Sequence, residues 1–340
     1  MNTSTSTSPA RLITLGSHGP TKVSVLGLGC MGMSGMYGAT DDAQSTSTIH
    51  AALDAGINLL DTGDFYGVGH NEALIGRALK GRREQAVLSV KFGAMRAPGG
   101  GWTGIDGRPA AVKNFLAYSL QRLGVDHIDI YRLARLDPNV PIEDTIGAMA
   151  DMVKAGYIRH IGLSEVGVHT IERAHAVHPI SDLQIEYSLI SRGPEAAIFP
   201  TLKKLGIGLT AYGVLSRGLL SGSRPTSGQD FRAHLPRFSA GNLAANEQLV
   251  AALQQVAVGL QSTASQVAVA WVLTRARELG VSTVALVGSR TLKQLSESLN
   301  AVSLNLGAAE MARIDAAVPS DAAMGTRYDA SQMAHLDSEK

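Results

Sequence analysis

Three polar residues, Asp61, Tyr66 and Lys91, stand at or just beyond the ends of two consecutive apolar runs. Asp61 ends the run INLLD (57–61), and Lys91 ends the run AVLSVK (86–91). A tyrosine with a pKa of about 10 donates a proton poorly at neutral pH, but a nearby ammonium stabilises the phenolate and lowers that pKa. An aspartate beside the lysine holds the ammonium in place and keeps it protonated. Together the three residue types predict proton donation by Tyr66.

Each of the three residues also has an ordinary structural interpretation. A tyrosine in a surface loop is commonly a rim contact, a lysine at a strand end is commonly solvated, and an aspartate before a threonine commonly caps a turn. The functional interpretation therefore requires a fold that brings the three side chains together.

The chain alternates short apolar runs with amphipathic stretches, and helical stretches such as 109–124 and 141–156 end in a glycine that favours a left-handed cap. Strands that alternate with helices predict a mostly parallel sheet, and eight such units favour a closed (β/α)8 barrel. The eight runs are 24–29, 57–61, 86–91, 127–133, 158–164, 183–187, 207–212 and 283–288.

The competing fold is a doubly wound dinucleotide-binding domain. Gly27, Gly29 and Gly32 have a Gly-x-Gly-x-x-Gly spacing, but no helix opens at the third glycine, so this signal lacks its structural context. In a barrel the active site lies at the carboxyl ends of the strands, which is where Asp61 and Lys91 stand. The barrel therefore explains more of the sequence.

We expect residues 1–10 to form a flexible tail, residues 11–320 to form the single barrel domain, and residues 321–340 to be irregular chain. The segment ITLGSHGPTKVSVLG (13–27) turns at Gly19 and Pro20 and predicts a β-hairpin that closes the barrel floor. Three further helices are expected near the C-terminus, at 243–260, 264–280 and 307–318.

The composition excludes several classes of partner. The chain has 340 residues, 45% of them hydrophobic and 17% charged, with a formal net charge of +1. No basic stripe suggests nucleic acid, no polybasic cluster suggests a membrane face, and no apolar run approaches the roughly 20 residues that span a bilayer. Cys30 is the one cysteine, which excludes an intramolecular disulfide, and we expect no metal site. We expect a cytoplasmic protein, monomeric or weakly self-associated, that acts on a small molecule.

The stretch DTGDFYGVGHNEALIGRAL (61–79) resembles the signature of the aldo-keto reductase family, and GLGCMGMSG, SVKFG, LQIEYSLISR and VGSRTLKQLSESL follow in family order. The resemblance implies an NADPH-dependent reductase of aldehydes or ketones on a (β/α)8 barrel. It also implies that Tyr66 gives a proton to the carbonyl oxygen, that Lys91 lowers its pKa, and that Asp61 positions the lysine. General acid catalysis of this kind is worth about 10²- to 10⁴-fold in rate.

One expected residue of the family is missing. The segment IYRLARLDP places Ala134 where the family has a catalytic histidine. Strand alternation puts Arg132 on the same face, one layer deeper, so it is a candidate to reach the substrate oxygen or Asp61; alternatively it pairs with a buried acid. Arg135 is expected to face outward in a structural pair near Asp137. A potassium-channel β-subunit-like regulator and a catalytically impaired cofactor-binding protein are the alternative functions.

The resemblance further implies a cofactor site. Ser164, Glu165 and Gln184 are expected at the nicotinamide amide and Tyr212 against its ring, unless Gln184 only bonds Glu186. Arg290 beside the helix that follows strand eight is expected at the 2′-phosphate, which favours NADPH over NADH. The other expected cofactor contacts are Gly29, Cys30, Met31, Asp61, Gly213, Leu215, Ser216, Arg217, Gly288, Ser289, Gln294, Glu297 and Ser298.

The substrate cannot be read from the sequence, but its pocket has candidates. Aromatic and methionine side chains near the strand ends predict an apolar pocket, with 96–109 as a flexible loop that closes over it, although each side chain could equally pack in the barrel. The candidates are Met31, Met33, Tyr37, Phe92, Trp102 and Tyr187.

Overall fold

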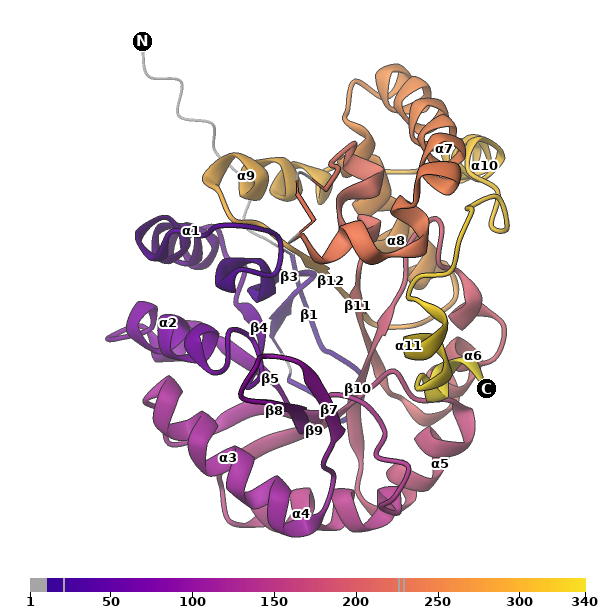
Figure 1. Cartoon of the computed structure of the whole chain (residues 1–340). Helices are drawn as coiled ribbons and strands as arrows, with labels where there is room; N and C mark the ends of the chain where they lie inside the picture. Colours follow the sequence, from indigo (N-terminus) through magenta and orange to yellow (C-terminus); the bar gives the residue numbers. More distant parts are fainter. Residues whose placement is uncertain (1–10, 21, 226, 229) are drawn as a thin grey trace.

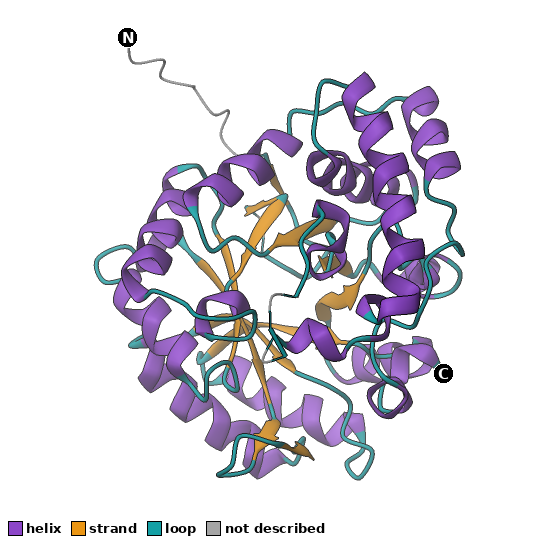
Figure 2. Ribbon diagram, turned by 45° about the horizontal axis from the view of Figure 1, so that its top comes forward, coloured by secondary structure: helices purple, strands orange, loops and turns teal. Residues whose placement is uncertain are grey.

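Eight parallel strands form a closed barrel in the computed structural model, which describes residues 11–20, 22–225, 227–228 and 230–340. The strands lie inside a ring of helices (Figures 1 and 2). This confirms the predicted (β/α)8 fold. In barrel order the strands are β10 (Ile180–Glu186), β11 (Gly208–Tyr212), β12 (Thr283–Val287), β3 (Leu26–Gly29), β4 (Leu59–Gly63), β5 (Val87–Phe92), β8 (Ile128–Leu133) and β9 (Ile158–Ser164).

The helices that follow the strands begin and end close to the predicted bounds. Gly124 (φ 65°) and Gly206 (φ 67°) end two of them in the left-handed conformation that the sequence indicated. The helices of the ring are α1 (Asp42–Asp54), α2 (His70–Ala78), α3 (Pro109–Leu123), α4 (Ile142–Lys154), α5 (Val168–Val177), α6 (Ile198–Leu205), α8 (Ala264–Glu278) and α9 (Leu292–Ala301).

Two further helices, α7 (Ala240–Gly259) and α10 (Ala308–Ala317), pack against each other outside this ring, as expected from the C-terminal pattern. None of the described helices is by itself apolar and long enough to cross a bilayer. Only α7 and α8 taken together pass that test of length and composition, and they are bent by 86° relative to each other.

The predicted N-terminal hairpin is present as β1 (Leu12–Ile13), which pairs antiparallel with β2 (Val23–Ser24). Leu15, in the turn between them, is fully buried in a cluster with Leu59, Ile130 and Val284 from inside the barrel. The hairpin therefore closes the end of the barrel opposite the carboxyl ends of the strands. The predicted tail, residues 1–10, lies outside the described residues.

Two segments are more regular than their sequences predict. The expected flexible loop 96–109 overlaps a hairpin formed by β6 (Ala94–Arg96) and β7 (Trp102–Ile105), with the Arg96 guanidinium 3.8 Å from the centre of the Trp102 ring. The expected irregular segment 321–340 contains α11 (Ala330–Ala334; Figure 1) and a 3-10 turn at Asp337–Glu339. The Ser338 N–H of this turn donates to the carbonyl of Glu165, just after β9 (3.3 Å). Short elements of this kind depend on contacts with distant residues, which local periodicity does not record.

Candidate active site

Asp61 and Lys91 form a buried ion pair on neighbouring strands, with 2.5 Å between Lys91 Nζ and Asp61 Oδ1. The second carboxylate oxygen accepts hydrogen bonds from Ser89 Oγ (2.8 Å) and Gln184 Nε2 (2.7 Å). Burial lowers the pKa of Lys91, and Asp61 opposes that effect through its charge and its hydrogen bond. The aspartate thus holds the ammonium in a fixed place at the carboxyl ends of the strands.

Tyr66 lies next to this pair, and the Lys91 ammonium is 5.2 Å from the centre of its ring. The three predicted residues are therefore brought together. Burial, followed by the charge of Asp61, raises the pKa of Tyr66 well above its ordinary value, so the net shift is opposite to the expected lowering. The nearby ammonium of Lys91 still favours the phenolate, but the opposing effects outweigh it, and the phenol keeps its proton at neutral pH.

Arg132 does not reach Asp61. Its guanidinium is fully buried and pairs with Asp182 on β10, with 3.1 Å between Nη2 and the carboxylate oxygen Oδ2. Asp182 also accepts hydrogen bonds from Ser181 and Thr210. The structure therefore contradicts the expected contact with Asp61 and matches the alternative of a buried ion pair, because the guanidinium binds Asp182 instead.

Arg135 also departs from its expected place. The carboxylate of Asp137 accepts hydrogen bonds from the backbone N–H groups of Gly107 and Asn139, both 2.9 Å away. Arg135 instead donates to Ser164 Oγ (3.4 Å) and to Tyr328 (3.2 Å) across the mouth of the barrel. The outward direction expected from strand alternation fails because β8 ends at Leu133, before Arg135.

The C-terminal segment supplies residues that the sequence argument missed. Arg327 forms two hydrogen bonds to the Glu165 carboxylate, of 2.8 Å and 2.6 Å, and these bonds together with Arg135 hold the pKa of Glu165 at about 2 against the effect of burial. Tyr212 donates to Glu165 (2.7 Å) and lies 2.9 Å from the hydroxyl of Tyr328. Residues 327 and 328 therefore belong to the barrel mouth, although no motif of the sequence marks them.

Two of the residues expected at the nicotinamide amide, Ser164 and Gln184, lie at the barrel mouth. Ser164 accepts a hydrogen bond from Arg135, and Gln184 donates one to Asp61. Gln184 donates to Asp61 rather than to Glu186, so the alternative Gln184–Glu186 bond is wrong. Glu186 instead binds Arg217 (2.8 Å) and Arg237 (3.3 Å), and Arg237 is a further residue that the sequence argument missed.

The loop after β11 follows a strained backbone. Gly213, Ser216 and Arg217 have φ values of 65°, 47° and 57°, and Leu215 lies between them. Left-handed backbone is costly for residues other than glycine, and it persists only where the surroundings enforce it. Here the ion pair between Arg217 and Glu186 and the stacking of Arg217 on Tyr328, 4.4 Å from the ring centre, anchor the loop beside the barrel mouth.

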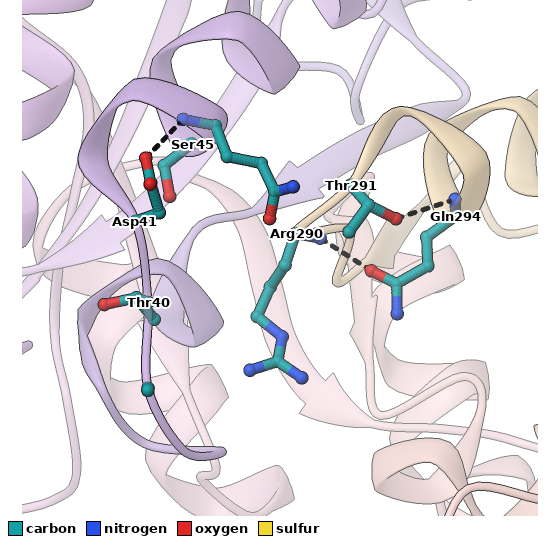
Figure 3. Close-up of a pocket in the computed structure, with 8 residues that line it drawn as sticks. Thr40, Asp41, Ser45, Arg290, Thr291 and Gln294 are labelled. Atoms are coloured by element: carbon teal, nitrogen blue, oxygen red, sulfur yellow. Dashed lines mark hydrogen bonds between the residues drawn. The ribbon is translucent and has the colours of Figure 1, made fainter.

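A cavity of about 380 Å³ opens between the start of α1 and the start of α9. Figure 3 shows the side chain of Arg290 extending into the space between Thr40 and Gln294. Arg290 and Gln294 were expected here, whereas Glu297 accepts a hydrogen bond from Thr263 and Ser298 is buried, so neither lines the cavity. The lining residues missed by the sequence argument are Ala39, Thr40, Asp41, Gln44, Ser45 and Thr291.

The end of β12 has the features of an anion seat. Gly288 is exposed, and space around it is open, since an added Cβ would meet no atom within 4 Å. Ser289 Oγ is buried without a hydrogen-bond partner. Helix α9 begins just beyond, capped by Thr291, so the positive end of its dipole faces this loop.

Three expected contacts lie at the end of β3. The Cys30 thiol is fully buried, and burial raises its pKa. The Cys30 N–H donates to the Asp61 carbonyl (2.9 Å), and the Cys30 carbonyl accepts from the Asn71 side chain (2.8 Å). A Cβ added at Gly29 would be in ordinary van der Waals contact, 3.7 Å from the Val287 carbonyl oxygen, so the protein itself does not require glycine there. Met31 begins a 3-10 turn and is half-buried.

The predicted substrate pocket is partly wrong. Met33, Phe92 and Tyr187 are fully buried in the core outside the barrel; Phe92 stacks on Tyr131 at 4.3 Å between ring centres. Trp102 and Tyr37 remain candidates for the substrate pocket. Trp102 packs against Phe65 at 5.3 Å, which in turn touches Tyr66 at 4.7 Å, so this aromatic row forms one wall at the mouth. Burial raises the pKa of Tyr37 to about 12, and its charge in turn raises the pKa of Tyr66.

Known proteins resemble this chain over most of its length. The model of the aldo/keto reductase family matches residues 25–319. A probable aldo-keto reductase 1 of Glycine max is 38% identical over 323 residues, which cover 93% of this chain and 91% of the relative.

Solved structures give the same result. A glycerol dehydrogenase from Gluconobacter oxydans superposes with a TM-score of 0.81 at 28% identity, covering 98% of this chain and 97% of the other. An aldo-keto reductase from Klebsiella pneumoniae, solved in complex with NADPH, has the same fold, with a TM-score of 0.72 at 23% identity over 94% and 99% of the two chains. The chain therefore belongs to the aldo/keto reductase family.

Proposed function

We propose that the protein reduces an aldehyde or ketone to an alcohol with NADPH, and that Tyr66 is the proton donor. The observation that carries the proposal is the buried Asp61–Lys91 pair beside Tyr66, with Lys91 Nζ 2.5 Å from Asp61 and 5.2 Å from the Tyr66 ring centre. A fixed ammonium next to a protonated phenol is a site at which negative charge developing on a carbonyl oxygen is stabilised and then neutralised.

The residues at the mouth fit an NADPH molecule. Gln184 uses its amide NH₂ on Asp61, which leaves its carbonyl oxygen free to accept from a carboxamide, and Ser164 Oγ supplies a donor. The unpartnered Ser289 Oγ and the open Gly288 backbone suit phosphate oxygens, and the Arg290 guanidinium in the adjacent cavity suits a 2′-phosphate. When bound, the nicotinamide supplies the hydride.

The raised pKa of Tyr66 is compatible with this role. A carbonyl oxygen that becomes an alkoxide is far more basic than a phenolate, so the phenol gives up its proton only when negative charge has formed on the substrate. Lys91 stabilises the phenolate that remains, at the expense of part of its interaction with Asp61. The charge of Asp61 thus keeps the proton on Tyr66 before the reaction. The charge of Lys91 favours transfer of that proton once negative charge has formed on the substrate oxygen.

The test is NADPH consumption by the purified protein with a panel of aldehydes and ketones, including pyridoxal and bulky ketones. Turnover supports the proposal. Tight NADPH binding without turnover of any carbonyl would contradict it and favour the regulatory or impaired alternative, which the missing histidine at Ala134 motivates.

Coenzyme preference has its own test. Arg290→Leu is expected to weaken NADPH binding about 10-fold or more and to leave NADH binding nearly unchanged, because only NADPH carries the 2′-phosphate. Lys293→Leu is the matched control, since Lys293 is exposed on the first turn of α9 and does not line the cavity. If Arg290→Leu weakened NADPH and NADH binding equally, Arg290 would have a structural role rather than a contact with the 2′-phosphate.

A further inference from the structure

Arg135 is a half-buried cation at the barrel mouth whose partners are all uncharged. Nη1 donates to the backbone oxygen of Ala134 (2.7 Å) and to Ser164 Oγ (3.4 Å), and Nη2 donates to Tyr328 (3.2 Å). Within the described part of the chain, no carboxylate lies within ion-pair distance of Arg135. A guanidinium in a partly buried position ordinarily has such a partner.

The neighbouring arginines differ in this respect. Arg217 and Arg237 both bind the carboxylate of Glu186, and Arg327 binds Glu165 at 2.6 Å. Arg327 also pairs with Glu339 at 2.6 Å, so its charge is shared between two carboxylates. The charges of Arg135 and Glu165 act on each other from a distance, but no carboxylate of the described residues contacts the Arg135 guanidinium directly.

Arg135 also has hydrogen-bonding capacity to spare. A guanidinium carries five N–H groups in a planar fork. Its recorded bonds use Nη1 and one N–H of Nη2, so Nε and the second N–H of Nη2 have no partner among the described residues, and Nε is not sealed from solvent. Nε and Nη2 form one edge of the fork, which is the geometry that binds the two oxygens of a carboxylate.

Arg135 lies near the reacting groups. Arg135 follows Ala134, the position of the missing histidine, and contacts Ser164 at the end of β9. Its charge acts on Tyr66, lowering a phenol pKa that burial and Asp61 raise, and it acts on Lys91 as well.

We propose that Arg135 is a substrate-binding residue that recognises a carboxylate carried by the substrate near its reducible carbonyl. The proposal rests on the proposed reductase function and names its substrate class, an aldehyde or ketone acid. A guanidinium that no described carboxylate contacts matches the carboxylate of a substrate, and the hydroxyl of Tyr328 lies beside it as a second donor. Binding of the acid group then orients the carbonyl toward Tyr66, a task for which the histidine is absent.

The experiment compares free acids with their methyl esters, which are neutral and otherwise nearly identical. Three aldehyde acids with increasing separation of the two groups are used: glyoxylate, succinic semialdehyde and 4-carboxybenzaldehyde. For at least one separation the wild-type protein is expected to prefer the acid by about 10-fold or more in kcat/KM. Arg135→Gln is expected to lower kcat/KM for that acid by about 10- to 100-fold and for the ester by less than about 3-fold.

Two further variants serve as controls. Arg135→Lys keeps the charge without the planar fork and should retain part of the preference. Arg96→Gln removes another cation near the entrance, which stacks on Trp102 and donates to the Gly100 carbonyl oxygen, and should leave the preference unchanged. Equal rates for acid and ester in the wild-type protein, or an equal fall for both in Arg135→Gln, would overturn the proposal.

Failure of the reductase function is distinguished by a binding measurement. Calorimetric titration with benzoate and with neutral benzamide is carried out on the wild-type protein and on Arg135→Gln. Benzoate binding that is lost in the variant supports the carboxylate site even if no aldehyde is reduced. Benzoate that binds both proteins equally, or neither, contradicts the site whatever the outcome of the turnover assays.

Discussion

Two ion pairs lie inside the same barrel. They differ in their depth and in whether all their polar atoms have hydrogen-bond partners. In the first, both oxygens of Asp61 are engaged, by Lys91, Ser89 and Gln184. In the second, Arg132 binds Asp182 through Nη2, while its Nε and Nη1 are buried without a partner. Asp182 stands two residues before Gln184 on β10, and so lies one inward-facing position further from the mouth.

The comparison shows that an inward charge near a strand end does not by itself indicate catalysis. Lys91 and Arg132 are register partners on adjacent strands, yet the Lys91 side chain meets an acid at the mouth and the longer Arg132 side chain meets an acid in the layer below. The difference between them is that Lys91 lies beside Tyr66. Variants of the two pairs should therefore separate activity from stability.

The largest effect is expected from Lys91→Met, which breaks the pair at the mouth. Turnover should fall by about 10²- to 10⁴-fold because the ammonium no longer stabilises the phenolate of Tyr66. The free energy of unfolding should also fall by roughly 3–5 kcal/mol, since Asp61 is left buried and unpaired. Steady-state kinetics and urea unfolding measure both quantities. Lys80→Met, at an exposed position, is the control, and full activity in the Lys91 variant would contradict the assignment.

Arg132→Met should affect stability alone. Removing the guanidinium leaves Asp182 buried without its cation, which costs about 3–5 kcal/mol in unfolding free energy, while kcat of the folded fraction stays near that of the wild type. The double variant Arg132→Met with Asp182→Leu replaces both charges and should recover most of the loss. A large fall in kcat in the double variant would contradict this prediction and indicate a catalytic role for Arg132.

A third buried acid, Asp64, sharpens the comparison because no cation among the described residues forms an ion pair with it. Burial, followed by the charge of Glu72, raises the pKa of Asp64 to about 7, against the opposing effects of the Gly93 backbone N–H and the charge of Arg122. Between about pH 4 and pH 7 the folded chain holds a proton that the unfolded chain has released, so stability decreases as the pH rises through that window.

Asp64→Asn should abolish that decrease. The wild type is expected to lose roughly 2–4 kcal/mol of unfolding free energy relative to the variant between pH 4 and pH 8. Urea unfolding across this range measures the difference. Parallel pH profiles for the two proteins would show that Asp64 is ionised alike in the folded and unfolded chains.

Much of this architecture could be predicted from the sequence. The apolar runs gave each strand of the barrel to within three residues, because the burial of parallel strands on both faces leaves a continuous apolar signal. The start of β10 was predicted three residues late because ISD, at its beginning, contains a buried serine and a buried aspartate that read as a turn. Asp182, which binds Arg132, lies in that stretch.

The errors in the site have two physical origins. Phe92 and Tyr187 follow the inward-facing residues Lys91 and Glu186, so alternation already indicated that they face the helices, and they were assigned to the pocket against that signal. Arg135, Arg327 and Tyr328 meet only through long-range packing of the C-terminal segment. No local pattern encodes such contacts. The alternation of inward- and outward-facing side chains no longer applies beyond the end of a strand.

The most direct test of the central claim is the variant Tyr66→Phe, which removes one hydroxyl and keeps the aromatic row of Phe65 and Trp102. NADPH affinity and carbonyl turnover are measured on the same preparation. We expect NADPH affinity within about 3-fold of the wild type and turnover lower by about 10²- to 10⁴-fold, as for loss of a general acid. Turnover that survives in Tyr66→Phe would contradict the account, because another group would then have to supply the proton.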